Sequence, residues 1–342
     1  MDAPLPAEDA RGAGPGATIH ALLALAWPIV ISRATQVVVG IADAVMVAHL
    51  GEAALAATTT GATNAFATFI FPMGIVFVVQ SFASQLFGRG DLAGARRFGW
   101  YGLAVAGGAQ ALGLLVALAT PRALAHLSYA ADVRALMSDY LQVRLLSAGA
   151  VVGMEALANY YGGLGNTRLP MRANVAAMVL NVAGNWLLID GRLGLPALGV
   201  AGAALASTLS TAVAFLGLFA TFVREGRRAG AGPLRGRELA RLLRFGLPSG
   251  FNWFFEVLAF VFFVNVVFVG LGTTALAALM AILQVNTVAF MPALALSSAG
   301  AILVGQAIGA RHPGRVPRLV ALRSGAPPGS ARAAARPGPW GR

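Results

Sequence analysis

The chain alternates long apolar segments with short polar connectors along most of its length. Eight segments are long enough to cross the hydrocarbon core of a bilayer, which takes about 20 apolar residues. They lie near residues 20–48, 53–82, 98–120, 138–161, 169–190, 197–222, 242–270 and 273–305. Because a backbone inside lipid must satisfy its own hydrogen bonds, each segment is predicted to be a helix. The pattern therefore predicts an all-α protein that crosses a membrane several times.

One apolar block occurs twice in the chain. The landmarks of the first copy are Leu23, Pro28, Gly51, Leu55, Pro72, Gln85 and Gly88. The same residue types recur at offsets of 220 or 221 residues, at Leu243, Pro248, Gly272, Leu276, Pro292, Gln306 and Gly309. Each copy consists of two apolar segments followed by a basic turn of small residues. Repeats of this kind are typical of secondary transporters that build two lobes around a site near the bilayer midplane.

Composition excludes a soluble protein and several kinds of chemistry. Hydrophobic residues make up 58% of the chain and charged residues 11%, whereas soluble domains carry roughly a quarter charged residues. There is no cysteine, so disulfides and thiolate sites are excluded. The net charge of +12 comes from arginines that lie between apolar spans and are not interleaved with aromatic residues. We therefore expect a lipid bilayer around the protein and no nucleic-acid partner.

The distribution of arginine predicts the orientation and the domain limits. Arginines are concentrated in one set of alternate loops, around residues 89–97, 168–172 and 224–244, and are few in the other set. The positive-inside rule places the first set and the N-terminus in the cytoplasm. We predict a cytoplasmic N-terminal tail (1–19), a six-helix first lobe (20–223), a cytoplasmic connector (224–241), the first two helices of a second lobe (242–308) and a basic tail (309–342). The membrane is predicted to be the inner (plasma) membrane.

Polar residues inside the spans are few, and they are the candidates for chemistry. An ionisable group at membrane depth costs roughly 3 kcal/mol or more, so it is seldom there without a role. Asp43 lies inside the first span, and Gln36 precedes it by two helical turns on the same face. Glu256 lies in the seventh span, with Asn252 one turn earlier.

The fifth span carries a similar stripe, Asn181 and Asn185, again one turn apart. If the three stripes face a common interior, they form a polar cavity within the bundle. The asparagine pair also has a structural interpretation, because such residues often hold helices together. Asp43 and Glu256 have no basic residue within one turn, so a local salt bridge does not explain them.

Three further polar positions are open to more than one interpretation. Glu155, with Asn159 one turn later in the fourth span, could bind a cation or pair with Arg144 through another helix. Gln284 in the eighth span is a further possible binding residue. Arg33 is expected to extend toward the cytoplasmic surface.

Five segments together carry a family resemblance. They are LLALAWPIVISRATQVVVGIADAVMVAHLG in the first span, QSFASQLFGRGDLAGARR, GLGNTRLPM from Gly163, LNVAGNWLLIDGRLGLPALGVAGAALAS, and RLLRFGLPSGFNWFFEV. An acidic residue late in the first span, NxxxNW in the fifth and FFE in the seventh form a specific combination. The chain resembles the multidrug and toxic compound extrusion (MATE) family, most closely its NorM-like branch, over residues 20 to about 320.

The resemblance implies twelve helices in two six-helix lobes and the antiport of organic cations against sodium or protons. It implies that Asp43 and Glu256 are the cation-coupling carboxylates and sodium ligands if sodium is the coupling ion, with Asn181 and Asn185 lining the first-lobe cavity. Gln36 and Asn252 complete the expected binding set. Partners would be small cationic or amphiphilic drugs, and the protein would be a monomer. Glu155 departs from the family, which more often has a neutral polar residue there.

The buried carboxylates are compatible with such an exchange mechanism, which needs no enzymatic cofactor. A carboxylate in a low-dielectric cavity favours capture of a proton, a sodium ion or a cationic substrate. Competition for one negative site then gives exchange driven by an ion gradient. The chain has neither a lysine nor a Walker-type phosphate loop, so we expect no cofactor beyond the coupling ion and no enzymatic activity.

The C-terminal part breaks the repeat. After Gly309 and Arg311 a ninth span is expected, but the chain continues as RVPRLVALRSGAPPGSARAAARPGPWGR, a composition typical of disorder. We interpret this as a frameshift or premature stop near residue 322, with a short paralogue as the alternative. The remaining hypotheses for function are a flippase of lipid-linked sugars from the same superfamily and a membrane protein that acts by association without transport.

Overall fold

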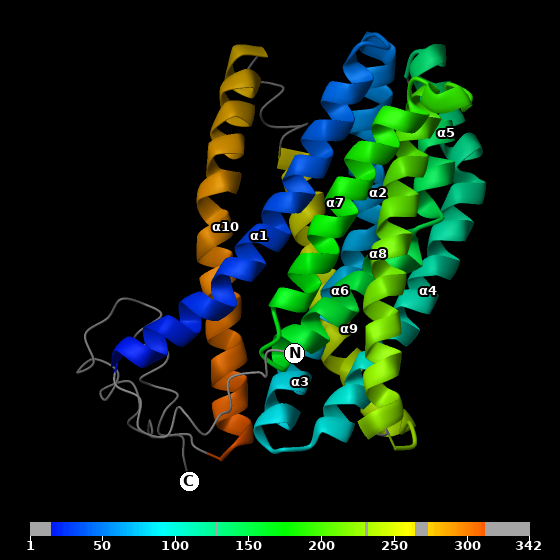
Figure 1. The fold of residues 1–342 in the computed structure, drawn as a ribbon. Coiled ribbons are helices and arrows are strands. Elements are labelled where there is room, and N and C mark those ends of the chain that lie inside the picture. The colour runs from blue at the N-terminus through cyan, green and yellow to red at the C-terminus, as the bar shows by residue number, and fades with distance from the viewer. Residues whose placement is uncertain (1–14, 127–128, 230–231, 264–272, 312–342) are drawn as a thin grey trace.

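The computed structural model describes residues 15–126, 129–229, 232–263 and 273–311 (Figure 1). Every regular element in these ranges is a helix. In chain order they are α1 (Pro15–Ala48), α2 (Glu52–Phe77), α3 (Val79–Gly88), α4 (Leu92–Ala125), α5 (Ala131–Leu145), α6 (Ala148–Gly163), α7 (Arg168–Leu188), the short 3-10 helix η2 (Arg192–Gly194), α8 (Gly199–Ala229), α9 (Gly236–Phe262) and α10 (Thr273–Gly309). The predicted all-α, multi-span fold is therefore confirmed.

Helices lie at all eight predicted span positions. Among the described residues, five are long and apolar enough to cross a membrane: 19–48, 52–88, 92–125, 199–226 and 290–309. A sixth is formed if α5 and α6, which meet at an angle of 48°, are counted as one broken span. The remaining two predicted spans correspond to α7 and α9, which are helical but do not meet the same test of length and hydropathy. Residues 1–14 and 312–342 of the predicted tails and residues 264–272 lie outside the described residues, whereas residues 15–19 of the predicted N-terminal tail are already part of α1.

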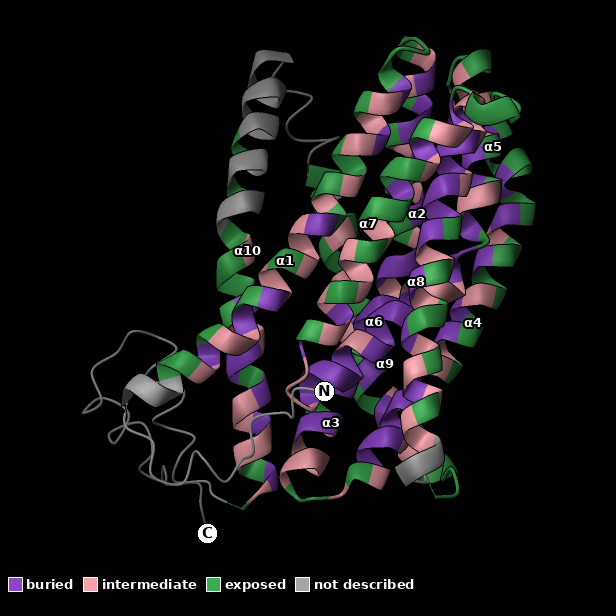
Figure 2. Cartoon of the chain, viewed as in Figure 1, coloured by how far each residue is buried: buried purple, intermediate pink, exposed green. Residues whose placement is uncertain are grey.

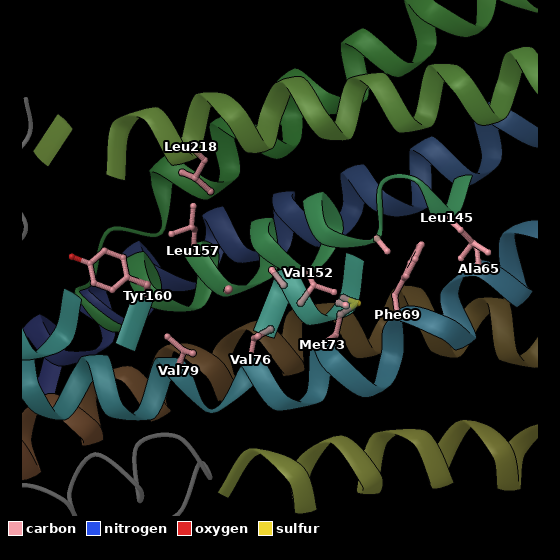
Figure 3. Packing of buried hydrophobic residues seen from close by; sticks show 14 of the residues in the cluster. Ala65, Phe69, Met73, Val76, Val79, Leu145, Val152, Leu157, Tyr160 and Leu218 are labelled. Carbon is pink, nitrogen blue, oxygen red and sulfur yellow. The ribbon is translucent and has the colours of Figure 1, made fainter. Parts of the chain in front are cut away.

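The first lobe packs around α2, α3 and α6, where the buried residues gather (Figure 2). Figure 3 shows the centre of this core, with Phe69 and Val76 from α2 facing Val152 and Leu157 from α6. Large apolar side chains on the outer helices are exposed instead, among them Leu118 on α4. Polar and closely packed side chains thus lie inside the bundle and large apolar side chains lie outside, where lipid can surround them.

Close helix contacts depend on small residues. On α4, a Cβ placed at Gly102 would lie 2.9 Å from the Cβ of Ala156 on α6, so the glycine lets the two backbones approach. Gly108, six residues further along the same helix, is exposed and has open space around it. The abundant glycine of the sequence is thus used at particular crossings and not along whole helices.

The two copies of the repeat pack directly on one another. The end of α3 meets the end of α10, where Gly88 lies against the backbone of Gln306 and Gly309 lies against the backbone of Gln85. Gln85 corresponds to Gln306, and Gly88 to Gly309, so the contact is reciprocal. In Figure 1, α10 lies beside α1 and descends to the level of α3.

The predicted connector (residues 224–241) forms hydrogen bonds and an ion pair with α4. Glu238, in the first turn of α9, forms a two-pronged ion pair with Arg97, from Nε to Oε2 at 2.7 Å and from the terminal nitrogen to Oε1 at 2.9 Å. The Tyr101 hydroxyl lies 3.1 Å from Glu238 Oε2 and accepts a hydrogen bond from the Arg235 N–H at 2.7 Å. The start of α9 is therefore held against the first lobe at the predicted cytoplasmic side.

Substituting leucine at Gly102 should lower stability, because the added side chain would overlap Ala156 and overpacking costs about 1–3 kcal/mol. The matched control is Gly108→Leu on the same helix, where the side chain enters open space. Thermal unfolding of the purified chain in detergent should show a clear decrease in Tm for Gly102→Leu and little change for Gly108→Leu. Equal changes for the two variants would contradict the close α4–α6 crossing.

Candidate functional site

The candidate site is built around the carboxylate of Asp43 near the end of α1. Asn185 Nδ2 donates to Asp43 Oδ1 at 2.6 Å, and Asn181 Nδ2 donates to the same oxygen at 3.2 Å. The Ser207 hydroxyl donates to Asp43 Oδ2 at 3.0 Å. Three helices therefore meet at one carboxylate: α1 supplies the acid, α7 the two amides and α8 the hydroxyl.

Local helix geometry explains this convergence. Asn181 and Asn185 are one turn apart, so both project from one face of α7 toward α1. Asn181 Nδ2 also lies 2.8 Å from Ser207 Oγ, which joins α7 to α8. All four residues are buried, and the two asparagines are fully enclosed. The cluster is thus a closed polar network inside the bundle.

The electrostatics of the cluster are unusual because no basic side chain among the described residues is hydrogen-bonded to the acid. Every hydrogen bond to Asp43 comes from a neutral amide or hydroxyl donor. Within the described residues, the Oδ1 atom of Asn185 is buried and has no hydrogen-bond partner. A network with a buried acid and one unused oxygen can accept a further proton or a small cation, since both groups gain a partner from it.

Ser207 was absent from the residues predicted from the sequence. It lies in the small-residue run of the sixth span, which the composition explains equally well as helix packing. The available signal is the polar sequence STLST, which begins at Ser207 inside an otherwise apolar span. A hydroxyl in that setting either bonds to its own helix or faces a partner, and only the fold distinguishes these cases.

Gln36 does not join the cluster, although it shares a face of α1 with Asp43. Its side chain is exposed, whereas Asp43 is buried. Seven residues of helix separate the two by about 10.5 Å along the axis, beyond the reach of the α7 asparagines. The two residues therefore differ in exposure, and joint binding by Gln36 and Asp43 stays a prediction.

The polar stripe of α9 also lies apart from the cluster. Asn252 and Glu256 are exposed and make no side-chain hydrogen bond with another described residue. The predicted convergence of three stripes is therefore seen for α1 and α7 only. The side chain of Gln284 lies outside the described residues.

Arg33 and Glu155 form an ion pair, which corrects two expectations. Arg33 on α1 does not extend toward the surface: its terminal nitrogen lies 2.9 Å from Glu155 Oε1 on α6. Arg144, the partner considered for Glu155, instead hydrogen-bonds Ser147 and lies over the ring of Phe69. A buried carboxylate draws the guanidinium inward because an uncompensated charge there is costlier than the lost hydration of the arginine.

The side chains around Asp43 determine which ions the site could bind. Within the part of the chain that the structure describes, no group of three or more His, Asp or Glu side chains is close enough to hold a metal ion. The oxygen atoms around Asp43 are the carboxylate, amide and hydroxyl type that suits a hard monovalent cation or a proton. Glu256, the other proposed sodium ligand, contributes nothing to this cluster.

A family model decides the relationship. The model named MatE matches residues 28–187 and 248–322. The chain belongs to the MATE family. The matched ranges contain Asp43, Asn181, Asn185 and Glu256, whereas Ser207 lies in the unmatched segment between them. Because MATE proteins are transporters, the expectation that this chain is not an enzyme is confirmed.

Curated relatives support the same assignment. The chain is 31% identical over 305 residues to a probable multidrug resistance protein NorM of Neisseria meningitidis serogroup A, covering 86% of this chain and 65% of the relative. It is 31% identical over 310 residues to a protein of the same name from Bradyrhizobium diazoefficiens, with the same coverage. The chain thus spans about 65% of the length of these NorM relatives.

Solved structures confirm the fold of this MATE chain. A crystal structure of MATE in complex with MaD5 superposes with a TM-score of 0.78 at 23% identity, covering 89% of this chain and 69% of that one. An outward-facing multidrug resistance MATE transporter of the MOP superfamily gives 0.75 at 24% identity, covering 89% and 68%. At these identities the likeness establishes the fold alone.

Replacing Asn185 with alanine should destabilise the folded chain. The buried carboxylate would lose its shortest donor, and a hydrogen bond to a charged group contributes about 1.5–3 kcal/mol. The matched control is Asn174→Ala on the same helix, because Asn174 bonds only the Pro170 carbonyl of its own helix. Thermal unfolding in detergent should show a larger decrease in Tm for Asn185→Ala than for Asn174→Ala, and the reverse order would contradict the network.

Proposed function

We propose that this MATE chain takes part in secondary active efflux, in which organic cations are exchanged for sodium or protons across the inner (plasma) membrane. The observation that carries the proposal is the buried Asp43 carboxylate, whose contacts are all neutral donors. Among the described residues no cationic side chain is hydrogen-bonded to this carboxylate, so it can bind an exchangeable cation.

Exchange follows from competition for this one site. A proton or sodium ion bound at Asp43 removes its negative charge and so weakens its attraction for a cationic substrate. A bound substrate cation displaces the ion in the same way, and rocking of the lobes then exposes the site to the opposite side. The unused Asn185 Oδ1 supports this role, because it offers an additional oxygen to a bound ion. Coupling energy comes from the ion gradient.

The second lobe is proposed to contribute Glu256, with Asn252 one turn earlier. Both residues are exposed on α9, which packs against α2. The orientation proposed from the arginine distribution, with the N-terminus in the cytoplasm, puts the α3–α10 contact and the Arg97–Glu238 pair on the cytoplasmic side. Closure at that side would leave the site accessible from outside. Cationic or amphiphilic drugs are the proposed partners.

The proposal is tested by ethidium efflux from cells that express this chain. Efflux above the empty-vector level is expected, and Asp43→Asn should reduce it at least tenfold because the exchange site loses its charge. The matched control is Asp139→Asn, an exposed acid on α5, which should retain efflux. No efflux above empty vector would overturn antiport by this chain, and efflux unaffected by Asp43→Asn would overturn the site assignment.

Ion coupling is measured separately, by ethidium binding to the purified chain at varied pH and sodium concentration. If Asp43 is the shared site, ethidium affinity should fall as the coupling ion increases, because both compete for one carboxylate. In Asp43→Asn this dependence should disappear. Affinity that falls with acid at constant sodium identifies protons, and affinity that falls with sodium at constant pH identifies sodium. Independence of both would contradict shared binding.

A further inference from the structure

A second carboxylate of the first lobe, Glu155, lies apart from the Asp43 cluster and is held differently. It is buried on α6, and Asn159 one turn later donates to its backbone carbonyl at 2.9 Å and lies 3.4 Å from its Oε1 atom. Only the second of these contacts reaches the carboxylate. The Glu155 side chain therefore has one weak partner on its own helix besides Arg33 of α1.

The counter-ion, Arg33, is the more exposed partner of the pair. The Glu155 side chain is 9% exposed, whereas the Arg33 side chain is 28% exposed and reaches across from α1. Only Oε1 of Glu155 accepts from Arg33, and Oε2 receives no hydrogen bond from the described residues. The fixed partner is the carboxylate, and the partner that can withdraw is the guanidinium on its long flexible stem.

The Arg97–Glu238 pair is a bidentate ion pair in the same protein and can be compared with the Arg33–Glu155 pair. There the guanidinium uses two nitrogens on two oxygens, at 2.7 and 2.9 Å. Such bidentate geometry adds both strength and directional specificity. Arg33 makes one such bond, so its contact with Glu155 leaves half of the carboxylate's capacity unused.

The unused capacity defines which cation can replace Arg33. A buried carboxylate left without a cation is strongly unfavourable, so Arg33 can withdraw only when another positive group arrives. A planar cation with two N–H groups on one edge can bond both oxygens at once, which the tethered arginine does not do. Amidinium and guanidinium groups have this form, whereas quaternary ammonium and phosphonium cations have no N–H donor.

We propose that Glu155 is a second cation subsite, which Arg33 occupies as a tethered competitor and which organic cations bearing an amidinium or guanidinium group take over. Arg33 then acts as a selectivity filter, since it admits ligands that bind the carboxylate better than it does. The proposal rests on the proposed function, because that function brings organic cations into the first lobe. Asp43 exchanges ions, and Glu155 recognises the shape of the cationic group.

Binding of the fluorescent diamidine DAPI to the purified full chain in lipid nanodiscs tests the proposal. Arg33→Gln removes the competitor and should tighten DAPI binding at least tenfold. The double variant Arg33→Gln with Glu155→Gln should lose this gain, because the carboxylate is gone. Arg97→Gln, which removes an arginine of the same size from the α4–α9 pair, should leave DAPI affinity unchanged. Unchanged or weaker DAPI binding by Arg33→Gln would overturn the proposal.

A second comparison covers the case in which Arg33→Gln does not fold. Glu155→Gln alone should weaken DAPI binding at least fivefold while leaving tetraphenylphosphonium binding unchanged, because the latter ligand has no N–H groups. Equal changes for the two ligands would overturn the selectivity claim. The two proposals fail separately: Asp43→Asn should abolish ion competition with ethidium but preserve the difference between DAPI and tetraphenylphosphonium.

Discussion

The structure depends above all on the cost of placing a carboxylate inside a membrane-spanning bundle. Asp43 meets this cost with three neutral donors from two other helices, so α1, α7 and α8 are fixed relative to one another by a single charge. Moving any of these helices leaves a buried acid short of donors. Apolar side chains do not favour one helix arrangement as strongly, because lipid tails are as apolar as leucine and solvate these side chains equally well. The polar cluster therefore contributes to the arrangement of the lobe as well as to its chemistry.

Two acids in one lobe illustrate two solutions to the same problem. Asp43 is solvated by amides and a hydroxyl, whereas Glu155 is neutralised by Arg33. The first solution leaves the charge available and the second cancels it. Both are compatible with membrane depth, but an incoming cation meets an unpaired carboxylate at the first site and must displace a tethered arginine at the second.

Much of the fold follows from sequence because hydropathy and helix formation are local properties. All eight predicted segments are helical, and Asn181 and Asn185 share a face because helical periodicity requires it. The sequence did not predict how deeply each polar side chain is buried, nor which residues from distant helices contact each other. Gln36 shares a face with Asp43 but is exposed, Ser207 lies in a run of small residues typical of helix packing, and Arg33 crosses from α1 to α6 to reach Glu155. These outcomes depend on how helices far apart in the chain are arranged, which periodicity does not encode.

The contact between the ends of α3 and α10 has a consequence for the origin of the fold. Each copy of the repeat supplies one glycine and one glutamine to it, and each glycine packs against the backbone of the glutamine from the other copy. A surface that carries both parts is complementary to itself, as in the isologous interface of a two-fold symmetric dimer. The internal contact therefore has the reciprocal form of an isologous dimer interface, which is the form expected if the two copies arose from one half-length unit that paired with itself.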